Sequence, residues 1–174
     1  TLAPIFEVQV QRRHRLVRHE GAWIELALDE GAIVDGRSRA PIYELELELK
    51  SGPLSALASL ARRWARRHEL WLDVRSKSER GHLLVQHQTA QPATRGRTPA
   101  LESGTPPDAA MRAIAGAALM QILPNAAALA AEGGSAEHVH QARIGLRRLL
   151  SSLRKFGAWS ADGRARAAVR ASGS

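Results

Sequence analysis

The sequence predicts an α+β protein, in which an antiparallel β-meander or part-barrel with packed helices is followed by an all-α helical segment. Short apolar or alternating runs at 5–10, 23–28 and 42–49 are separated by the turn signals Glu20-Gly21 and Asp35-Gly36, as expected for consecutive antiparallel strands. Apolar residues then recur at helical spacing after residue 53, and alanine and leucine dominate beyond residue 107.

Two helices are predicted directly after the strands. Gly52-Pro53 precedes the first, and proline suits the first turn of a helix because its missing N–H has no partner there. This helix is expected to pack on the sheet, because the residues that recur at helical spacing are Leu54, Leu57, Ala58, Leu60, Ala61, Trp64, Ala65 and His68. Ser76 and Glu79 then have the spacing of a capping box, which places Lys77 and Arg80 at the opening of a short second helix.

Residues 86–107 are predicted to be a linker, because they combine four prolines and two glycines with no apolar periodicity. They separate region 1–85 from region 108–174. In the second region a helix opens at Pro107-Asp108 and runs toward residue 131, and Pro124 is expected to kink or interrupt it. Ser135 is the predicted N-cap of a further helix that continues to about residue 156.

Composition limits the chemistry that this chain can perform. The 174 residues include no cysteine, which excludes disulfides and thiolate metal sites and leaves carboxylates and histidine as metal ligands, so a hard ion such as Mg²⁺ or Mn²⁺ is expected. No run of eighteen apolar residues or charged-then-apolar leader is present, and we therefore expect a cytoplasmic protein without a membrane span.

The net charge of +8 is concentrated in the second half of the chain. Residues 1–91 carry 14 basic and 12 acidic residues (+2), whereas residues 92–174 carry 11 and 5 (+6). The second half is therefore the better candidate for binding a polyanion. Its few aromatic residues are not interleaved with basic ones as a base-stacking surface requires, so phosphate groups are favoured over nucleic acid. The sequence leaves the oligomeric state open.

One predicted strand is unusually acidic. Strict alternation over 43–50 places Glu44, Glu46, Glu48 and Lys50 on one face and three leucines on the other. Three carboxylates in a row repel one another, so a neutralising cation is expected. The simplest explanation is a solvated edge strand that is protected by its charge. The alternative is a site for a divalent metal and phosphate.

A neighbouring strand repeats this pattern with Glu25 and Asp29 on one face. Together with the cationic side chains Arg12, Lys50, Lys77 and Arg80, these strands could form a cavity that holds a metal through carboxylates and phosphate oxygens through cations. Such mixed charge suits phosphoryl transfer, because metal ions and basic side chains neutralise the phosphate while a carboxylate orients the attacking water.

Three segments resemble the CYTH family: residues 25–29, the Glu-Leu-Glu-Leu-Glu-Leu-Lys run at 44–50, and Ser-Lys-Ser-Glu-Arg-Gly at 76–81. Members are triphosphate tunnel metalloenzymes, in which an antiparallel barrel encloses acidic metal ligands and basic phosphate ligands. The resemblance implies catalytic roles for Glu44, Glu46, Glu48 and Lys77, metal ligation by Glu25, Asp29, Glu46 and Glu48, and phosphate contacts from Arg12, Lys50, Lys77 and Arg80.

The position of the acidic strand departs from the family pattern. The hallmark Glu-x-Glu-x-Lys strand, matched here by Glu46, Glu48 and Lys50, normally lies at the extreme N-terminus of the domain. The flanking segments instead resemble the second half of a CYTH domain, so residues 1–85 are interpreted as that C-terminal half. An open half-barrel would leave unpaired strand edges and favour aggregation, dimerisation or loss of activity.

The last predicted helix carries a basic stripe. A rotation of about 100° per residue places His140, Arg143, Arg147 and Arg154 within an arc of about 60°. The opposite, core-facing side is predicted to consist of Val139, Ala142, Leu146, Leu149, Leu150, Leu153 and Phe156. A solvated basic face is the simplest explanation of the stripe.

Residues 138–149 resemble the start of a CHAD domain, a helical module rich in histidine and basic residues that binds inorganic polyphosphate. The resemblance implies polyphosphate contacts from His140, Arg143 and Arg147, and from Arg148 and Arg154. His140 could instead be a packed histidine. Residues 108–174 would then be the N-terminal helices of a CHAD domain, a module that often follows CYTH domains in bacterial proteins.

These resemblances together predict metal-dependent hydrolysis of inorganic triphosphate or polyphosphate, coupled to polyphosphate binding. One alternative is a noncatalytic protein that binds polyphosphate or targets polyphosphate granules. Another is an adenylyl cyclase or thiamine triphosphatase, activities that occur elsewhere in the CYTH superfamily.

Overall fold

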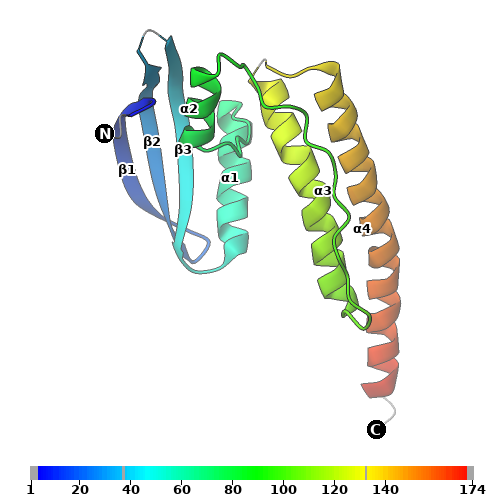
Figure 1. The fold of residues 1–174 in the computed structure, drawn as a ribbon. Helices are drawn as coiled ribbons and strands as arrows, with labels where there is room; N and C mark the ends of the chain where they lie inside the picture. Colours follow the sequence, from blue (N-terminus) through cyan, green and yellow to red (C-terminus); the bar gives the residue numbers. More distant parts are fainter. Residues whose placement is uncertain (1–3, 37, 132, 172–174) are drawn as a thin grey trace. The chain divides into compact units, whose positions relative to one another are not determined.

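The computed structural model describes residues 4–36, 38–131 and 133–171, with side-chain surroundings described as far as residue 156. The chain forms two compact units, residues 1–91 and residues 92–174. The first contains strands β1 (Glu7–His19), β2 (Ala22–Asp35) and β3 (Ser38–Ser51), then helices α1 (Leu54–His68) and α2 (Lys77–Val85) (Figure 1). The second contains helices α3 (Pro107–Ala130) and α4 (Ala136–Ala171). The predicted α+β class is confirmed.

The three strands form an antiparallel meander in the order β1-β2-β3. Both predicted turns join them, with positive φ at Glu20 (45°), Gly21 (79°) and Gly36 (51°). The strands are longer than the predicted ones. Backbone pairing continues beyond the apolar runs into polar segments, where no hydrophobic alternation marks a strand. Gly31 permits this pairing, since a Cβ at that position would lie 2.0 Å from the carbonyl oxygen of Gln9 on β1.

Helix α1 packs on the leucine face of the sheet. The core there is formed by Ala22, Ile24, Ala56 and Leu60, with Val17, Leu26, Leu47, Leu49, Leu57 and Trp64 packed around it. Gly52 allows the sharp entry into α1 through its φ of 102°. Because side chains alternate along a strand, burial of the leucines under α1 directs the glutamates of β3 to the other face.

Helices α3 and α4 pack on one another around what we call the amide seam, Gln121, Asn125 and Gln141. The side chains of Gln121 and Asn125 are fully buried, and Gln121 Nε2 donates to Gln141 Oε1 over 2.8 Å. Asn125 also exchanges two hydrogen bonds with the backbone of Thr94. Part of the segment predicted as a linker, from Pro92 onward, therefore packs within the second unit.

Helix α3 runs through Pro124 as one element, so the proline does not interrupt it. Among the described helices, α3 has the length and mean hydropathy (1.5) of a membrane-spanning helix. The core helix of a soluble protein meets the same criterion, and two fully buried amide side chains on α3 are paired within the protein. That composition suits a helix packed against protein.

The predicted core-facing side of α4 is wrong for four of its seven residues, while Ala142, Leu149 and Phe156 are half-buried. Val139 (43% exposed), Leu146 (47%), Leu150 (52%) and Leu153 (42%) are open to solvent in the described part of the chain. The buried stripe instead contains His138, Gln141, Gly145 and Ser152. Two features select it: hydrogen bonding across the amide seam, and Gly145, where a Cβ would lie 2.7 Å from Ile122. Helix α4 also extends well beyond residue 156, to Ala171.

Candidate functional site

The strand register assembles a polar row across all three strands. Arg12 on β1 lies opposite Asp29 on β2, and Asp29 lies opposite Glu44 on β3. Glu46 is two residues along on the same face of β3, and Glu48 lies opposite Glu25. The predicted common face is therefore present, and it is the face that α1 does not cover.

Helix α2 supplies two further cations to this row. The predicted capping box is confirmed: Ser76 accepts from the backbone N–H of Glu79 and Glu79 accepts from that of Ser76, which fixes the first turn of α2. Phe6 packs against α2, because a Cβ on Gly81 would lie 2.5 Å from its ring and His82 meets the ring edge-on. These contacts hold α2 at the sheet, with Lys77 in the first turn.

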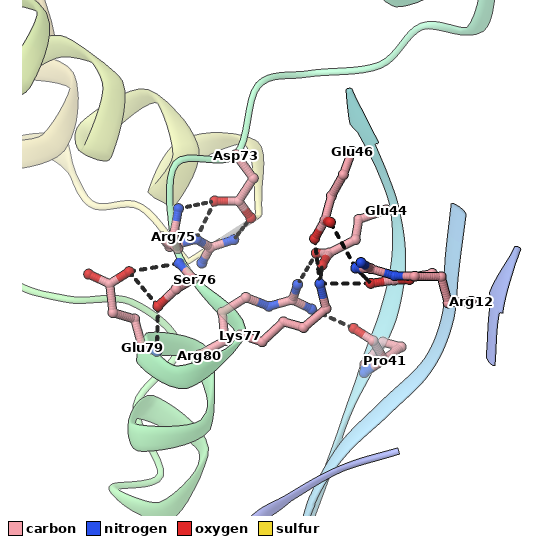
Figure 2. Close-up of polar contacts among 11 residues, drawn as sticks. Arg12, Pro41, Glu44, Glu46, Asp73, Arg75, Ser76, Lys77, Glu79 and Arg80 are labelled. Carbon is pink, nitrogen blue, oxygen red and sulfur yellow. Dashed lines mark hydrogen bonds and ion pairs between the residues drawn. The ribbon is translucent and has the colours of Figure 1, made fainter. Parts of the chain in front are cut away.

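Six side chains form what we call the mixed-charge cluster: Arg12, Asp29, Glu44, Glu46, Lys77 and Arg80 (Figure 2 shows most of their contacts). Lys77 Nζ lies 2.8 Å from Asp29 Oδ2 and 2.8 Å from Glu46 Oε1, and it also contacts Glu44. Arg12 grips Asp29 with two hydrogen bonds of 2.6 Å and reaches Glu46 at 2.7 Å. One lysine thus contacts carboxylates from two strands.

Arg80 completes the cluster from the second turn of α2. Its Nη1 lies 2.9 Å from Glu44 Oε2, and its Nη2 donates to the carbonyl oxygen of Pro41 over 2.6 Å. The backbone contact fixes the orientation of the guanidinium group. Three carboxylates and three cations therefore balance within the cluster.

The fully buried carboxylate of Asp29 is held ionised. The hydrogen bonds from Arg12, and then those from Lys77, lower the pKa of Asp29 well below its usual range despite burial. Burial would lower the pKa of Lys77, but its bonds to Asp29, Glu44 and Glu46 outweigh burial and raise it. Asp29 and Lys77 are consequently both charged at neutral pH.

The remaining predicted residues form a second group on the same face. Lys50 Nζ lies 2.9 Å from Glu48 and 3.5 Å from Glu25, and the pKa of Lys50 is raised chiefly by its hydrogen bond to Glu48. His14 Nδ1 lies 3.8 Å from Glu25. The structure therefore separates the predicted metal ligands: Asp29 and Glu46 share one cluster, whereas Glu25 and Glu48 lie with Lys50.

A divalent metal fits the mixed-charge cluster by its donor atoms. One carboxylate oxygen from each of Asp29, Glu44 and Glu46 lies within 4.8 Å of the others. An all-oxygen donor set suits hard cations such as Mg²⁺ and Mn²⁺. Glu44, which the sequence assigned to catalysis rather than to metal binding, belongs to this donor set.

The predicted polyphosphate-binding residues of α4 fall into two groups. His140, Arg143, Arg147 and Arg154 are exposed, as expected for a basic stripe. Arg148 instead donates to Gln121 Oε1 over 3.2 Å and to the carbonyl oxygen of Arg97 over 3.1 Å. Arg148 thus joins the segment after residue 92 to the two helices, on a different side of α4 from the stripe.

Sequence reasoning missed several residues that shape the site. His14 lies two residues from Arg12 on the same strand face, and alternation along β1 would have found it. Asp73 and Arg75 pair just before α2, where Arg75 Nη2 lies 2.8 Å from Asp73. Burial would raise the pKa of Asp73, but its bonds from Arg75 lower it. Nothing in the sequence pattern indicates that these two neighbours pair or that Pro41 accepts from Arg80.

Fold and site together define an α+β unit whose sheet carries a self-neutralised cluster with donors for phosphate and acceptors for a hard metal. No protein-family model matches the chain. An inorganic triphosphatase from Haemophilus influenzae is 36% identical to it over 88 residues, which cover 51% of this chain and 25% of that protein. The chain thus aligns with about a quarter of the length of this curated relative.

Proposed function

We propose that the mixed-charge cluster is the centre of a metal-dependent hydrolase that cleaves inorganic triphosphate or polyphosphate. The observation that carries this proposal is the convergence of Arg12, Lys77 and Arg80 on Asp29, Glu44 and Glu46. The similarity to an inorganic triphosphatase supports the same substrate class and a CYTH-type domain. A cytoplasmic location accords with this substrate.

Each side chain of the cluster has a role that its chemistry allows. Asp29, Glu44 and Glu46 would hold the metal, and the cations Arg12, Lys50, Lys77 and Arg80 would bind the phosphate oxygens. When bound, the metal supplies positive charge that neutralises the phosphate oxygens. Lys77 and Arg80 stabilise the charge that develops on the leaving phosphate as water attacks the terminal phosphorus. Glu44, Glu46 and Glu48 are the candidates to orient that water.

The charge balance of the cluster suggests how substrate enters. Because its three cations and three carboxylates are paired with one another, a phosphate chain can take over the cations and leave the carboxylates to a metal. Substrate and metal should therefore bind more tightly together than either does alone. Lys77 is central to this exchange, because its ammonium group contacts all three carboxylates and must leave them when it binds phosphate.

The exposed stripe on α4 is the second part of the proposal. His140, Arg143, Arg147 and Arg154 would bind long inorganic polyphosphate, as the resemblance to a CHAD domain implies. Binding of cations to a linear polyanion releases condensed counterions, so the affinity should fall as salt rises. Arg143→Gln with Arg147→Gln should weaken polyphosphate binding, because both side chains are exposed and neither contributes to the amide seam. Equal affinity for DNA would argue against a dedicated site.

Phosphate release from tripolyphosphate, with and without Mg²⁺ or Mn²⁺, tests the enzymatic part. Lys77→Gln should lower the rate by roughly 10² to 10³, the usual effect of removing one donor to developing charge. Lys155→Gln removes one charge from an exposed position on α4 and should leave the rate unchanged. Hydrolysis that persists in Glu44→Gln and Glu46→Gln would disprove the site.

Three substrates separate the alternatives. Faster turnover of ATP or thiamine triphosphate than of tripolyphosphate would favour the adenylyl cyclase or thiamine triphosphatase function. Binding of tripolyphosphate with no phosphate release, even when Mg²⁺ or Mn²⁺ is present, would favour a noncatalytic polyphosphate-binding protein.

A further inference from the structure

Helix α1 carries a second concentration of positive charge. It packs on the leucine face of the sheet, whereas the mixed-charge cluster lies on the other face. Four arginines occupy the second half of α1, and we call them the arginine surface: Arg62, Arg63, Arg66 and Arg67. Helix α1 contains no acidic residue. None of these four arginines forms an ion pair within the described part of the chain. Arg12, Lys77 and Arg80, by contrast, are all paired with carboxylates.

Helix stability alone does not account for this arrangement. Basic residues in the last turn interact favourably with the helix dipole, which explains Arg66, Arg67 and His68. Arg62 and Arg63 lie one turn earlier, and each has another arginine four residues on, a like-charge spacing that destabilises a helix. An anion bound between the arginines of each pair would relieve this repulsion.

Two shallow, open hollows lie on the arginine surface. A groove of about 300 Å³ lies between α1 and the sheet, and an adjoining hollow of about 560 Å³ lies among the helix arginines. Arg63 and Arg67 line both hollows. An anion seated between them would therefore meet guanidinium groups on two sides, and guanidinium matches the oxygens of phosphate bidentately.

The arrangement favours closely spaced phosphate groups over other anions. Trp64 is partly buried in the α1 core and contacts His68, with ring centroids 5.1 Å apart, so the surface lacks the run of exposed aromatic rings on which successive bases of a nucleic acid stack. Carboxylates on one face of an extended peptide recur only about every 6.6 Å. Four helix arginines lie within a rise of about 7.5 Å, which calls for a denser anion.

We propose that the arginine surface is a second binding site for condensed inorganic phosphate, on the sheet face opposite the mixed-charge cluster. Its ligand has at least two adjacent phosphate groups, which span Arg63, Arg67 and their neighbours. The site binds without metal, since only cations line its charged rim. Its role is distinct from hydrolysis, because α1 and the core beneath it separate it from Asp29 and Lys77.

Titration calorimetry with tripolyphosphate at low ionic strength and without divalent metal tests this site. All proteins carry Arg143→Gln and Arg147→Gln, so that the α4 stripe does not contribute. Arg63→Gln with Arg67→Gln should weaken binding at least tenfold, as expected for loss of two charge-assisted contacts. Arg39→Gln with Arg95→Gln is the matched control, because it removes the same charge from exposed arginines elsewhere.

The outcomes decide between a site and general attraction. Equal weakening in the two double variants would show that net charge alone governs binding, and unchanged affinity in the Arg63 and Arg67 variant would also overturn the proposal. So would equal affinity for a glutamate-rich peptide or a single-stranded oligonucleotide. Circular dichroism verifies folding, and Arg62→Gln with Arg66→Gln provides a second test if the first pair fails to fold. Lys77→Gln should leave this binding intact, so failure of hydrolysis and failure of the second site are distinguishable.

Discussion

The mixed-charge cluster and the amide seam both bury polar side chains, but they satisfy them in different ways. In the cluster, ionised groups neutralise one another across β1, β2, β3 and α2, and several of the partners are partly exposed. In the seam, neutral amides from α3 and α4 bond to one another and to Thr94, under nearly complete burial.

Because of this difference, the mixed-charge cluster can exchange its partners for a ligand, whereas the amide seam serves only to stabilise the packing of α3 and α4. A phosphate or a metal can replace one charged partner of the cluster with another of the same sign. No ligand of comparable strength can reach the amides of the seam, and an unpaired buried amide is costly. Buried polarity by itself therefore does not indicate function; the sign and accessibility of the partners do.

The largest change in stability is expected at acid pH, where protonation of Asp29 removes its ion pairs in the mixed-charge cluster. The pKa of Asp29 is lowered in the folded state, so the stability contributed by its ionised form is present above its unfolded pKa of about 4 and is lost as pH falls below that value. Urea unfolding followed by tryptophan fluorescence reports chiefly on this unit, because it contains three of the four tryptophans, Trp23, Trp64 and Trp71. In Asp29→Asn the free energy of unfolding should depend less on pH in the acid range. An identical pH dependence in wild type and variant would contradict the role given to Asp29.

Loss of one amide should destabilise the seam without affecting the site. Asn125→Leu removes the partner of the Thr94 backbone N–H and carbonyl, and leaving such groups unsatisfied costs about 1–3 kcal/mol each. Denaturant unfolding followed by far-UV circular dichroism measures the change. Met120→Ala, at a 69% exposed position of the same helix, should change stability by less than about 0.5 kcal/mol. A fall in tripolyphosphate hydrolysis at unchanged folding would contradict the separation.

The smallest effect is expected on the leucine face of α4. Leu150 is 52% exposed, so Leu150→Gln should change the free energy of unfolding by about 0.5 kcal/mol or less. Leu60, only 6% exposed in the α1 core, gives the matched comparison, because Leu60→Ala should cost about 2–5 kcal/mol. If Leu150→Gln costs as much as Leu60→Ala, the predicted core-facing side of α4 was right after all.

The sequence by itself determined the elements whose signals are local. Glu20-Gly21 and Asp35-Gly36 encode turns within two residues, and Ser76 and Glu79 encode the start of α2 within four. Alternation over 43–50 likewise determined which side chains of β3 share a face. Each of these depends on backbone geometry that a few neighbouring residues establish, so sequence periodicity is enough to find it.

Only the tertiary structure decided which charges meet. Strand register places Arg12 and Glu44 on either side of Asp29, and the packing of Phe6 on α2 brings Lys77 to them from outside the sheet. The same holds for α4, where Gly145 and Gln141 rather than the leucines face α3. These choices depend on contacts between residues far apart in the chain, because shape and hydrogen bonding between elements outweigh the periodicity of any one of them.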